Sequence, residues 1–303
     1  MVYTEYRLVE AFGKTMTNSS VLVLGGTGNL GRSVRRLSMM FNEYSFFFPS
    51  REEFPFEDGA EILHQLDRIK PNAIINAVAW TNVDEAERCQ SEAWYLNAVF
   101  PKVIASWCSE RGARFIHYST NYVFDGCDPD PYLEIHQKSP LSFYGASKSE
   151  GENAILELAA PGNIIVRTSG LYGFTSNNFV TKILNRAKQG DELRVVVDQI
   201  MTPTNADDLA HFSLTLLEKG NLPEVVHFAN SGCTNWNEVA RAVYTFVGQD
   251  PEKVKEVQSS EYLTVAKRPR QGRLGTLHPK LIAESNHEWN QSLDSFLREV
   301  VND

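Results

Sequence analysis

The chain of 303 residues has no long hydrophobic run, no paired cysteine motif and no excess of positive charge. Without a stretch of about 18 apolar residues, a membrane-spanning helix is not expected. The four cysteines show neither CxxC spacing nor a histidine at metal-ligand spacing, so we expect reduced thiols in a cytoplasmic protein and no bound metal. A net charge of −9 argues against a general nucleic-acid-binding function.

Short apolar segments alternate with helical patterns over the first half of the chain. Strands are expected at 21–24, 44–48, 73–79, 115–119 and 164–167, and helices at 29–40, 59–69, 83–89, 92–110 and 145–158. Strands without polar alternation that are separated by helices indicate a parallel sheet covered on both faces. The predicted fold class is α/β, a doubly wound Rossmann-type sheet, whose ligands bind at the carboxyl ends of the strands.

The alternation predicts three parts of the chain. Residues 1–20 are expected to be a weakly structured extension. They contain acidic residues and lack an apolar core, so they do not have the pattern of a signal peptide. Residues 21–170 are predicted to form the dinucleotide-binding domain. Residues 171–303 are predicted to form mainly a smaller substrate-binding lobe, with some segments returning to the first domain.

A glycine-rich loop, "VLVLGGTGNLGR", lies between the first predicted strand and the first predicted helix. Such a loop lets the backbone approach a pyrophosphate and directs helix N–H groups at it, so we predict a dinucleotide site. An NAD site usually has an acid about 20 residues after the last glycine. Here Ser50 and Arg51 occupy that region and could bind a 2′-phosphate, which favours NADPH, with NADH as the alternative.

A second motif, "FYGASK", places Tyr144 and Lys148 on one face of a predicted helix. An ammonium close to a phenol favours the phenolate, so this pair could transfer a proton near neutral pH. The strand in "HYSTNYVFDG" ends in hydroxyls, where Thr120 could polarise a substrate carbonyl, with Ser119 as the competing donor. We read His117, inside that strand, as a core histidine with satisfied partners, and the acids of "DEAERC" at 84–89 as a solvated helix start.

Taken in order, "GGTGNLG", "NAVAWTNVDEAE", "STNYVFDG", "PLSFYGASKSEGE", "RTSGLYG", "NFVTKIL", "DQIMTPT" and "KRPRQGRL" resemble the dTDP-4-dehydrorhamnose reductase family of extended short-chain dehydrogenase/reductases. The resemblance runs from Val21 to about Leu281. It implies hydride transfer from NAD(P)H to carbon 4 of a nucleotide-linked 4-keto-6-deoxy sugar, most directly dTDP-4-dehydro-L-rhamnose. It also implies that Thr120, Tyr144 and Lys148 form the catalytic set.

The resemblance further implies contact residues for both ligands. The expected cofactor contacts include Ser50 and Arg51 after the second strand and the pair Tyr144 and Lys148. The full set is Gly25, Thr27, Gly28, Asn29, Leu30, Gly31, Ser50, Arg51, Ala77, Val78, Ala79, Asn97, Ser119, Tyr144, Lys148, Arg167, Thr168 and Ser169. The expected substrate contacts are Asn121, Tyr122, Gly170, Met201, Arg268 and Arg273.

The chain departs from the family pattern on the substrate side. Asn121 stands where the family has an acid, Gly170 where it has a tryptophan, Met201 where it has a glycine and Gly272 where it has a serine. We therefore expect Gly170 and Met201 to reshape the sugar pocket. A different nucleotide-sugar 4-reductase or an epimerase stays open, as does a non-catalytic NADP-binding subunit like methionine adenosyltransferase beta. A homodimer is also left open.

Overall fold

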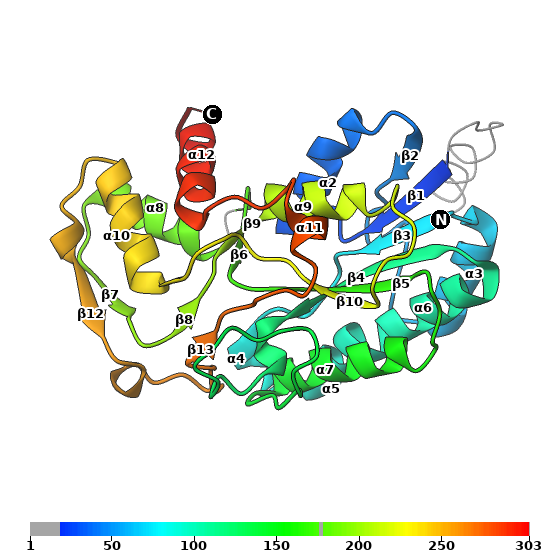
Figure 1. The fold of residues 1–303 in the computed structure, drawn as a ribbon, viewed down its shortest axis with the longest axis horizontal. Helices are drawn as coiled ribbons and strands as arrows, with labels where there is room; N and C mark the ends of the chain where they lie inside the picture. Colours follow the sequence, from blue (N-terminus) through cyan, green and yellow to red (C-terminus); the bar gives the residue numbers. More distant parts are fainter. Residues whose placement is uncertain (1–18, 176–177, 303) are drawn as a thin grey trace.

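The computed structural model describes residues 19–175 and 178–302, and its larger part is built on one parallel sheet (Figure 1). The order of the six strands is β10-β5-β4-β3-β1-β2. These strands are β1 (Ser19–Leu24), β2 (Tyr44–Phe47), β3 (Ala73–Asn76), β4 (Arg114–Thr120), β5 (Asn163–Thr168) and β10 (Val225–His227). β1 begins two residues earlier than predicted, and residues 1–18 of the predicted extension lie outside the described residues.

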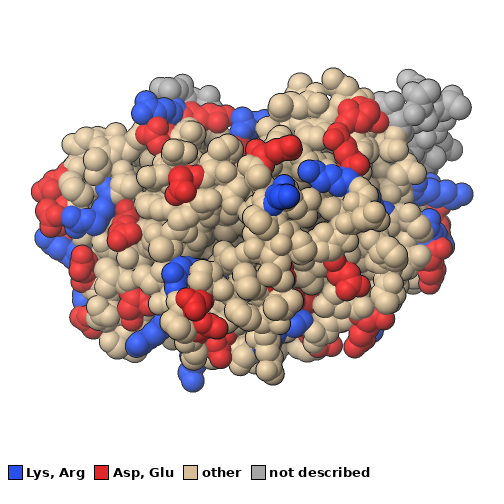
Figure 2. Space-filling view, in the orientation of Figure 1, with Lys and Arg blue, Asp and Glu red and all other residues tan. Residues whose placement is uncertain are grey.

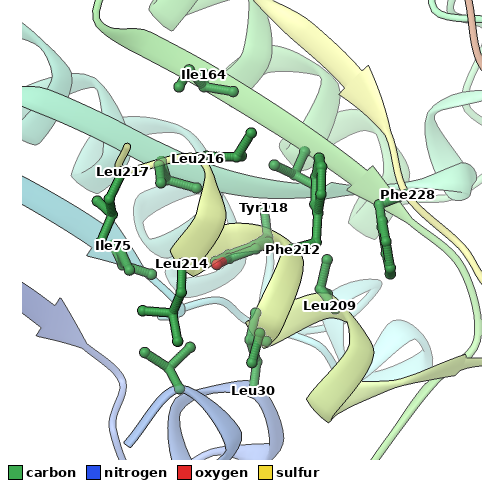
Figure 3. Close-up of a cluster of buried hydrophobic side chains, with 14 of the residues drawn as sticks. Leu30, Ile75, Tyr118, Ile164, Leu209, Phe212, Leu214, Leu216, Leu217 and Phe228 are labelled. Atoms are coloured by element: carbon green, nitrogen blue, oxygen red, sulfur yellow. The ribbon is translucent and has the colours of Figure 1, made fainter. Parts of the chain in front are cut away.

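Helices cover both faces of this sheet because successive strand residues point to opposite sides. The helices of one face are α2 (Asn29–Leu37) and α9 (Ala206–Thr215), and those of the other are α3 (Gly59–Ile69), α6 (Phe100–Arg111) and α7 (Phe143–Leu156). Figure 3 shows Leu209, Phe212 and Leu214 of α9 directed at the sheet. The doubly wound class expected from the sequence is therefore confirmed.

The segment predicted as two helices between residues 83 and 110 consists of four pieces. They are α4 (Val83–Ala86), α5 (Gln90–Trp94), the π-helical turn η2 (Tyr95–Val99) and α6. Pro101 lacks the N–H that would otherwise donate to the Asn97 carbonyl, which accounts for a wider turn here. The sequence pattern did not predict this turn.

The smaller lobe, at the left in Figure 1, is built from short strands and three longer helices. Its sheets pair β11 (Thr234–Asn235), β8 (Ile200–Met201) and β13 (Gln271–Gly272), and separately β7 (Leu193–Val196) and β12 (Val254–Val257). Its helices are α8 (Phe179–Gln189), α10 (Trp236–Phe246) and α12 (Trp289–Asn302). These helices enclose a separate apolar core that includes Tyr172, Tyr244 and Phe296.

Two parts of the second half return to the first domain: α9 packs on α2, and β10 extends the sheet beside β5. The parallel pair β6 (Leu171–Tyr172) and β9 (Thr204–Asn205) lies between the two parts. The remaining short elements are η1 (Ser38–Met40), η3 (Asn121–Val123), η4 (Pro251–Lys253), η5 (Ser259–Glu261) and α11 (Pro279–Ile282). The final helix, α12, was not predicted from the sequence.

The visible face in Figure 2 carries acidic and basic side chains that are interspersed, without a broad field of one sign. Within residues 19–175 and 178–302, no helix is long and apolar enough to cross a membrane.

Candidate active site

A cleft of about 470 Å³ lies at the carboxyl ends of β1, β3, β4 and β5, facing the smaller lobe. This is the edge at which a doubly wound sheet binds its ligands. The predicted cofactor and catalytic residues that line the cleft are Gly28, Asn29, Leu30, Ala77, Val78, Ala79, Ser119, Thr120, Tyr144, Lys148 and Thr168. The sequence therefore located most of one wall.

The glycine loop forms one end of the cleft, with Gly25, Thr27 and Gly31 behind its lining residues. The Gly28 N–H donates to the Gly25 carbonyl at 3.0 Å, and Gly28 caps α2 without any side-chain hydrogen bond. A Cβ on Gly31 would lie 2.1 Å from the Gly25 oxygen, so only glycine allows this packing. The loop leaves helix N–H groups facing the cleft, as a pyrophosphate site requires, and the residues present fit a dinucleotide.

Ser50 and Arg51 lie in an exposed turn after β2 and do not line the cleft. Arg51 Nε donates to Glu57 Oε1 at 2.9 Å, and this hydrogen bond lowers the pKa of the Glu57 carboxyl. Both side chains are exposed, with 70% and 56% of their surfaces accessible. Since exposed ion pairs contribute little, Glu57 would compete only weakly with a phosphate for Arg51.

Tyr144, the predicted catalytic tyrosine, is placed by the start of α7. Ser142 caps this helix by accepting the Gly145 N–H at 3.2 Å. A Cβ on Gly145 would lie 2.2 Å from the Tyr122 carbonyl oxygen, so the glycine lets the first turn of α7 press against η3. The rings of Tyr122 and Tyr144 consequently meet edge to face, with 5.6 Å between centroids.

The hydroxyl of Thr120 lies beside Tyr144 and at the N-terminus of η3. Its Oγ1 accepts the Tyr122 N–H at 3.2 Å and donates to Asn121 Oδ1 at 3.3 Å. Burial raises the pKa of Tyr144 to about 12, and the hydrogen bond with Thr120 lowers this pKa by a smaller amount. The expectation that the Lys148 ammonium lowers this pKa stays a prediction.

Lys148 contacts a histidine instead. It is fully buried, and its Nζ lies 3.2 Å from His117 Nε2. Burial lowers the pKa of Lys148 to about 8, although the charge of Glu152 opposes this shift. His117 is buried and has polar partners, as expected of a core histidine, but sequence reasoning missed that one partner is the lysine of the Tyr-Lys pair.

Beyond the glycine loop and the turn after β2, three further predicted cofactor residues do not line this cleft: Asn97, Arg167 and Ser169. The Asn97 amide is hydrogen-bonded to the backbone of Trp80 and to Ser147, so it ties the loop after β3 to α7. The Arg167 guanidinium forms a buried bidentate pair with Glu152 at 2.8 and 2.7 Å, directed away from the cleft. Ser169 lines a small neighbouring pocket.

That pocket, of about 70 Å³, adjoins the cleft and brings together all four departures from the family pattern: Asn121, Gly170, Met201 and Gly272. Gly170 has a φ of +56°, and a Cβ there would lie 3.0 Å from Met201 Sδ. Gly170 and Met201 thus face each other, as expected. A Cβ on Gly272 would lie 2.3 Å from Asn121 Nδ2, a second contact that the sequence did not predict.

The two arginines among the expected substrate contacts, Arg268 and Arg273, line neither pocket. Arg268 Nη2 pairs with Asp84 Oδ2 at 2.7 Å, and Asp84 Oδ1 also accepts the Ala266 N–H at 2.9 Å. Asp84 therefore holds the 266–268 loop against α4, which corrects its interpretation as part of a solvated helix start. Arg273 donates to the Pro129 carbonyl.

Sequence reasoning missed other residues that line the cleft: Thr81 and Val83 after β3, and Leu171, Asn178, Phe179 and Trp236 on the opposite wall. The quoted motif "NFVTKIL" was a signal for Asn178 and Phe179, because an asparagine before an apolar run is typical of a helix N-cap. Asn178 caps α8, and its Nδ2 donates to the Gly173 carbonyl at 2.7 Å. Nothing in the local pattern marked Trp236, which starts α10.

The parallel sheet, the glycine loop and the Tyr-Lys pair define an oxidoreductase of the extended short-chain dehydrogenase/reductase type. Residues 19–302 match the family model described as RmlD substrate binding domain. A dTDP-4-dehydrorhamnose reductase from Escherichia coli is 35% identical over 85% of this chain and 89% of its own. A dTDP-4-keto-6-deoxy-D-glucose reductase from Streptomyces niveus is 35% identical over 84% of this chain and 88% of its own.

A solved structure agrees with these sequence relatives. The dTDP-4-dehydrorhamnose reductase from Bacillus anthracis, in complex with NADP, has a TM-score of 0.87 and 30% identity over 93% of this chain and all of its own. The chain therefore belongs to the dTDP-4-dehydrorhamnose reductase family, as the sequence motifs predicted.

Proposed function

We propose that this protein uses NADPH to reduce the 4-keto group of a dTDP-linked 4-keto-6-deoxy sugar, with dTDP-4-dehydro-L-rhamnose as the leading substrate. The observation that carries the proposal is the meeting of Thr120, Tyr144 and Lys148 in the cleft that also holds the glycine loop. A dinucleotide and a sugar carbonyl can be brought together there. The names of the relatives support the same chemistry.

The proposed roles follow from the side chains. When bound, the nicotinamide cofactor supplies a hydride. Thr120 Oγ1 donates a hydrogen bond to the substrate carbonyl, and the Tyr144 hydroxyl gives its proton to that oxygen as negative charge develops there. The free-protein pKa of about 12 makes Tyr144 a weak acid, so cationic Lys148 has to lower that pKa during turnover. Tyr122 packs against Tyr144 and holds its ring edge-on.

The preference for NADPH is assigned to Ser50 and Arg51. Replacing Arg51 by Asp would remove a charge-assisted contact worth about 1.5–3 kcal/mol to a 2′-phosphate. The kcat/KM for NADPH relative to NADH should fall accordingly in Arg51→Asp. The matched control is Glu57→Gln, which frees Arg51 from its partner and should leave or strengthen the preference. An unchanged ratio in Arg51→Asp would disprove this assignment.

The substrate is the finer part of the proposal. Because two relatives of 35% identity are named for reductions of different dTDP sugars, overall similarity does not settle the sugar. The reshaped pocket at Gly170 and Met201 supports tolerance of a sugar or nucleotide other than the leading one. The test offers dTDP-, UDP-, GDP- and CDP-linked 4-keto-6-deoxy sugars with NADPH and follows the loss of cofactor absorbance.

The same assay separates the competing functions. Stoichiometric oxidation of NADPH with the dTDP sugar is the expected result. An epimerase would convert the sugar with no net change in absorbance, and a regulatory subunit would bind NADP without turning over any of the sugars. Either outcome would reject the reductase. A homodimer remains a prediction.

A further inference from the structure

Three polar side chains, the last of which is Lys148, form a buried row that crosses from the sheet to α7. Asn76 on β3 and His117 on β4 are paired in register. Asn76 Nδ2 lies 3.2 Å from His117 Nδ1, and His117 Nε2 lies 3.2 Å from Lys148 Nζ. All three residues are at least 98% buried, so these partners are largely shielded from bulk water.

The direction of the hydrogen bonds in this row is fixed at one end. A backbone N–H can only donate, and that of Val78 donates to Asn76 Oδ1 at 3.1 Å. The amide nitrogen of Asn76 therefore faces His117, and it too can only donate. His117 Nδ1 must then accept, which leaves the proton of a neutral imidazole on Nε2. This proton points at the Lys148 nitrogen, and only the neutral amine can accept it.

We propose that His117 is a positioning residue that donates from Nε2 to Lys148 and thereby favours the neutral amine of this lysine. The inference deepens the reductase function proposed above, on which its catalytic consequence rests. Burial acts in the same direction, since it lowers the pKa of Lys148 to about 8. Burial lowers the pKa of His117 well below its ordinary value, and the charge of Lys148 lowers it further whenever that lysine is protonated, so the imidazole is neutral in both cases.

The other titratable groups around Lys148 do not supply this effect. Glu152, one turn further along α7, favours the ammonium, but its charge is shared with Arg167 on β5 at 2.7 Å and Lys138 at 3.1 Å. Tyr144 on α7 and Tyr122 in η3 both have raised pKa values and are neutral at physiological pH. His117 is thus the neighbour whose tautomer decides which form of Lys148 is accommodated.

The consequence for catalysis is a pH limit. Turnover requires the ammonium, because only the cation lowers the pKa of Tyr144. A hydrogen bond that favours the amine makes the active form disappear at a lower pH. The alkaline decline of kcat/KM, which reports the free enzyme, should therefore respond to the His117 tautomer.

The first test reads the tautomer directly. In protein labelled with ¹⁵N-histidine, NMR should show His117 neutral with its proton on Nε2, and the signal is assigned by its loss in His117→Gln. A proton on Nδ1, or an imidazolium at neutral pH, would overturn the proposal. This measurement needs no enzymatic activity, so it stands even if the proposed reductase function fails.

The second test uses a nearly isosteric substitution to reverse the direction of the hydrogen bonds in the row. In Asn76→Asp, the carboxylate accepts from Val78 and from His117 Nδ1–H, so Nε2 becomes an acceptor for the ammonium. The pKa of Lys148, followed by NMR of its labelled side chain, should rise by about one unit or more. The alkaline limit of kcat/KM should move with it.

A control separates the tautomer from the simple effect of a new negative charge. In the double variant Asn76→Asp, His117→Leu, the carboxylate remains but the relay is broken, so most of the upward shift should be lost. His117→Gln in the same background serves as a second, polar replacement if the leucine disturbs folding. Equal shifts with and without His117 would reject the proposed role.

Discussion

The two walls of the cleft are specified in different ways. The sheet wall comes from the ends of β1, β3, β4 and β5 and from the first turn of α7, which follow one another between residues 19 and 168. The lobe wall comes from Gly170 and Trp236, together with Met201 and Gly272 of the adjoining pocket, and all four lie in or beside strands of two residues. Such short strands have few ladder bonds, so side-chain contacts position this wall. The sheet wall is fixed by local sequence and the lobe wall by long-range packing.

The largest effect is expected when the Tyr144 hydroxyl, the proposed proton donor of the sheet wall, is removed. Tyr144→Phe should retain cofactor affinity and lose turnover by about 10²–10⁴-fold, because positioned proton transfer contributes that much. Binding is followed by cofactor fluorescence and turnover by absorbance. Since the hydroxyl alone is removed, the edge-to-face packing on Tyr122 is conserved. Parental turnover in this variant would refute the assignment of Tyr144 as the acid.

The next effect concerns the packing of the glycine loop. Gly31→Ala would place a Cβ 2.1 Å from the Gly25 carbonyl oxygen, against backbone that cannot rotate away. We expect a loss of about 3 kcal/mol in the free energy of unfolding, together with weaker cofactor binding. The matched control is Gly28→Ala, whose Cβ would meet nothing closer than 3.5 Å at an ordinary φ of −74°. Equal stability of the two variants would contradict the close packing of Gly31 on Gly25.

A substitution of Lys148 tests whether this buried residue of the sheet wall lowers the free energy of unfolding. Its pKa is about 8 in the folded protein and about 10.5 when unfolded, so the unfolded chain binds more protons between these values. The free energy of unfolding of the parent therefore rises with pH from about 8 to 10.5. At pH 7, Lys148→Met should be more stable than the parent by at most about 3 kcal/mol, and inactive.

The measurement is chemical denaturation of both proteins at several pH values. The advantage of Lys148→Met should shrink as the pH rises through this window. An advantage independent of pH would show that it comes from packing and not from the buried amine.

Sequence reasoning reached the sheet wall because each of its parts has a local signature. Apolar strands, a glycine loop and an i, i+4 pair can be recognised without knowing the rest of the fold. Partners distant in sequence have no such signature: His117 meets Lys148 across two elements, and Asp84 meets Arg268 across the whole molecule. The partners are 31 and 184 residues apart in the sequence, so neither pairing could be predicted without knowing how strands and loops are brought together.

The smallest expected effect sharpens the comparison at the lobe wall. The structure disfavours Gly170→Trp as a probe, because φ is +56° and Pro203 Cα would lie 3.0 Å from the new Cβ whatever residue replaces Met201. The contact between Gly272 and Asn121 is a better probe of this wall, because the atom that a new Cβ would meet, Asn121 Nδ2, is the end of a side chain that can move. Gly272→Ala should push the Asn121 amide aside and raise KM for the sugar nucleotide.

Replacing Asn121 by a shorter residue should remove the effect of Gly272→Ala on KM. In Asn121→Ser the amide is gone, so adding Gly272→Ala should change KM little, and the two substitutions should couple by about 0.5–3 kcal/mol. Gly272→Ala should leave the cofactor dissociation constant unchanged in either background, because Gly272 lines only the adjoining pocket. Additive changes in KM would mean that the two residues do not share the substrate pocket, whereas altered cofactor affinity would mean that the walls are not independent.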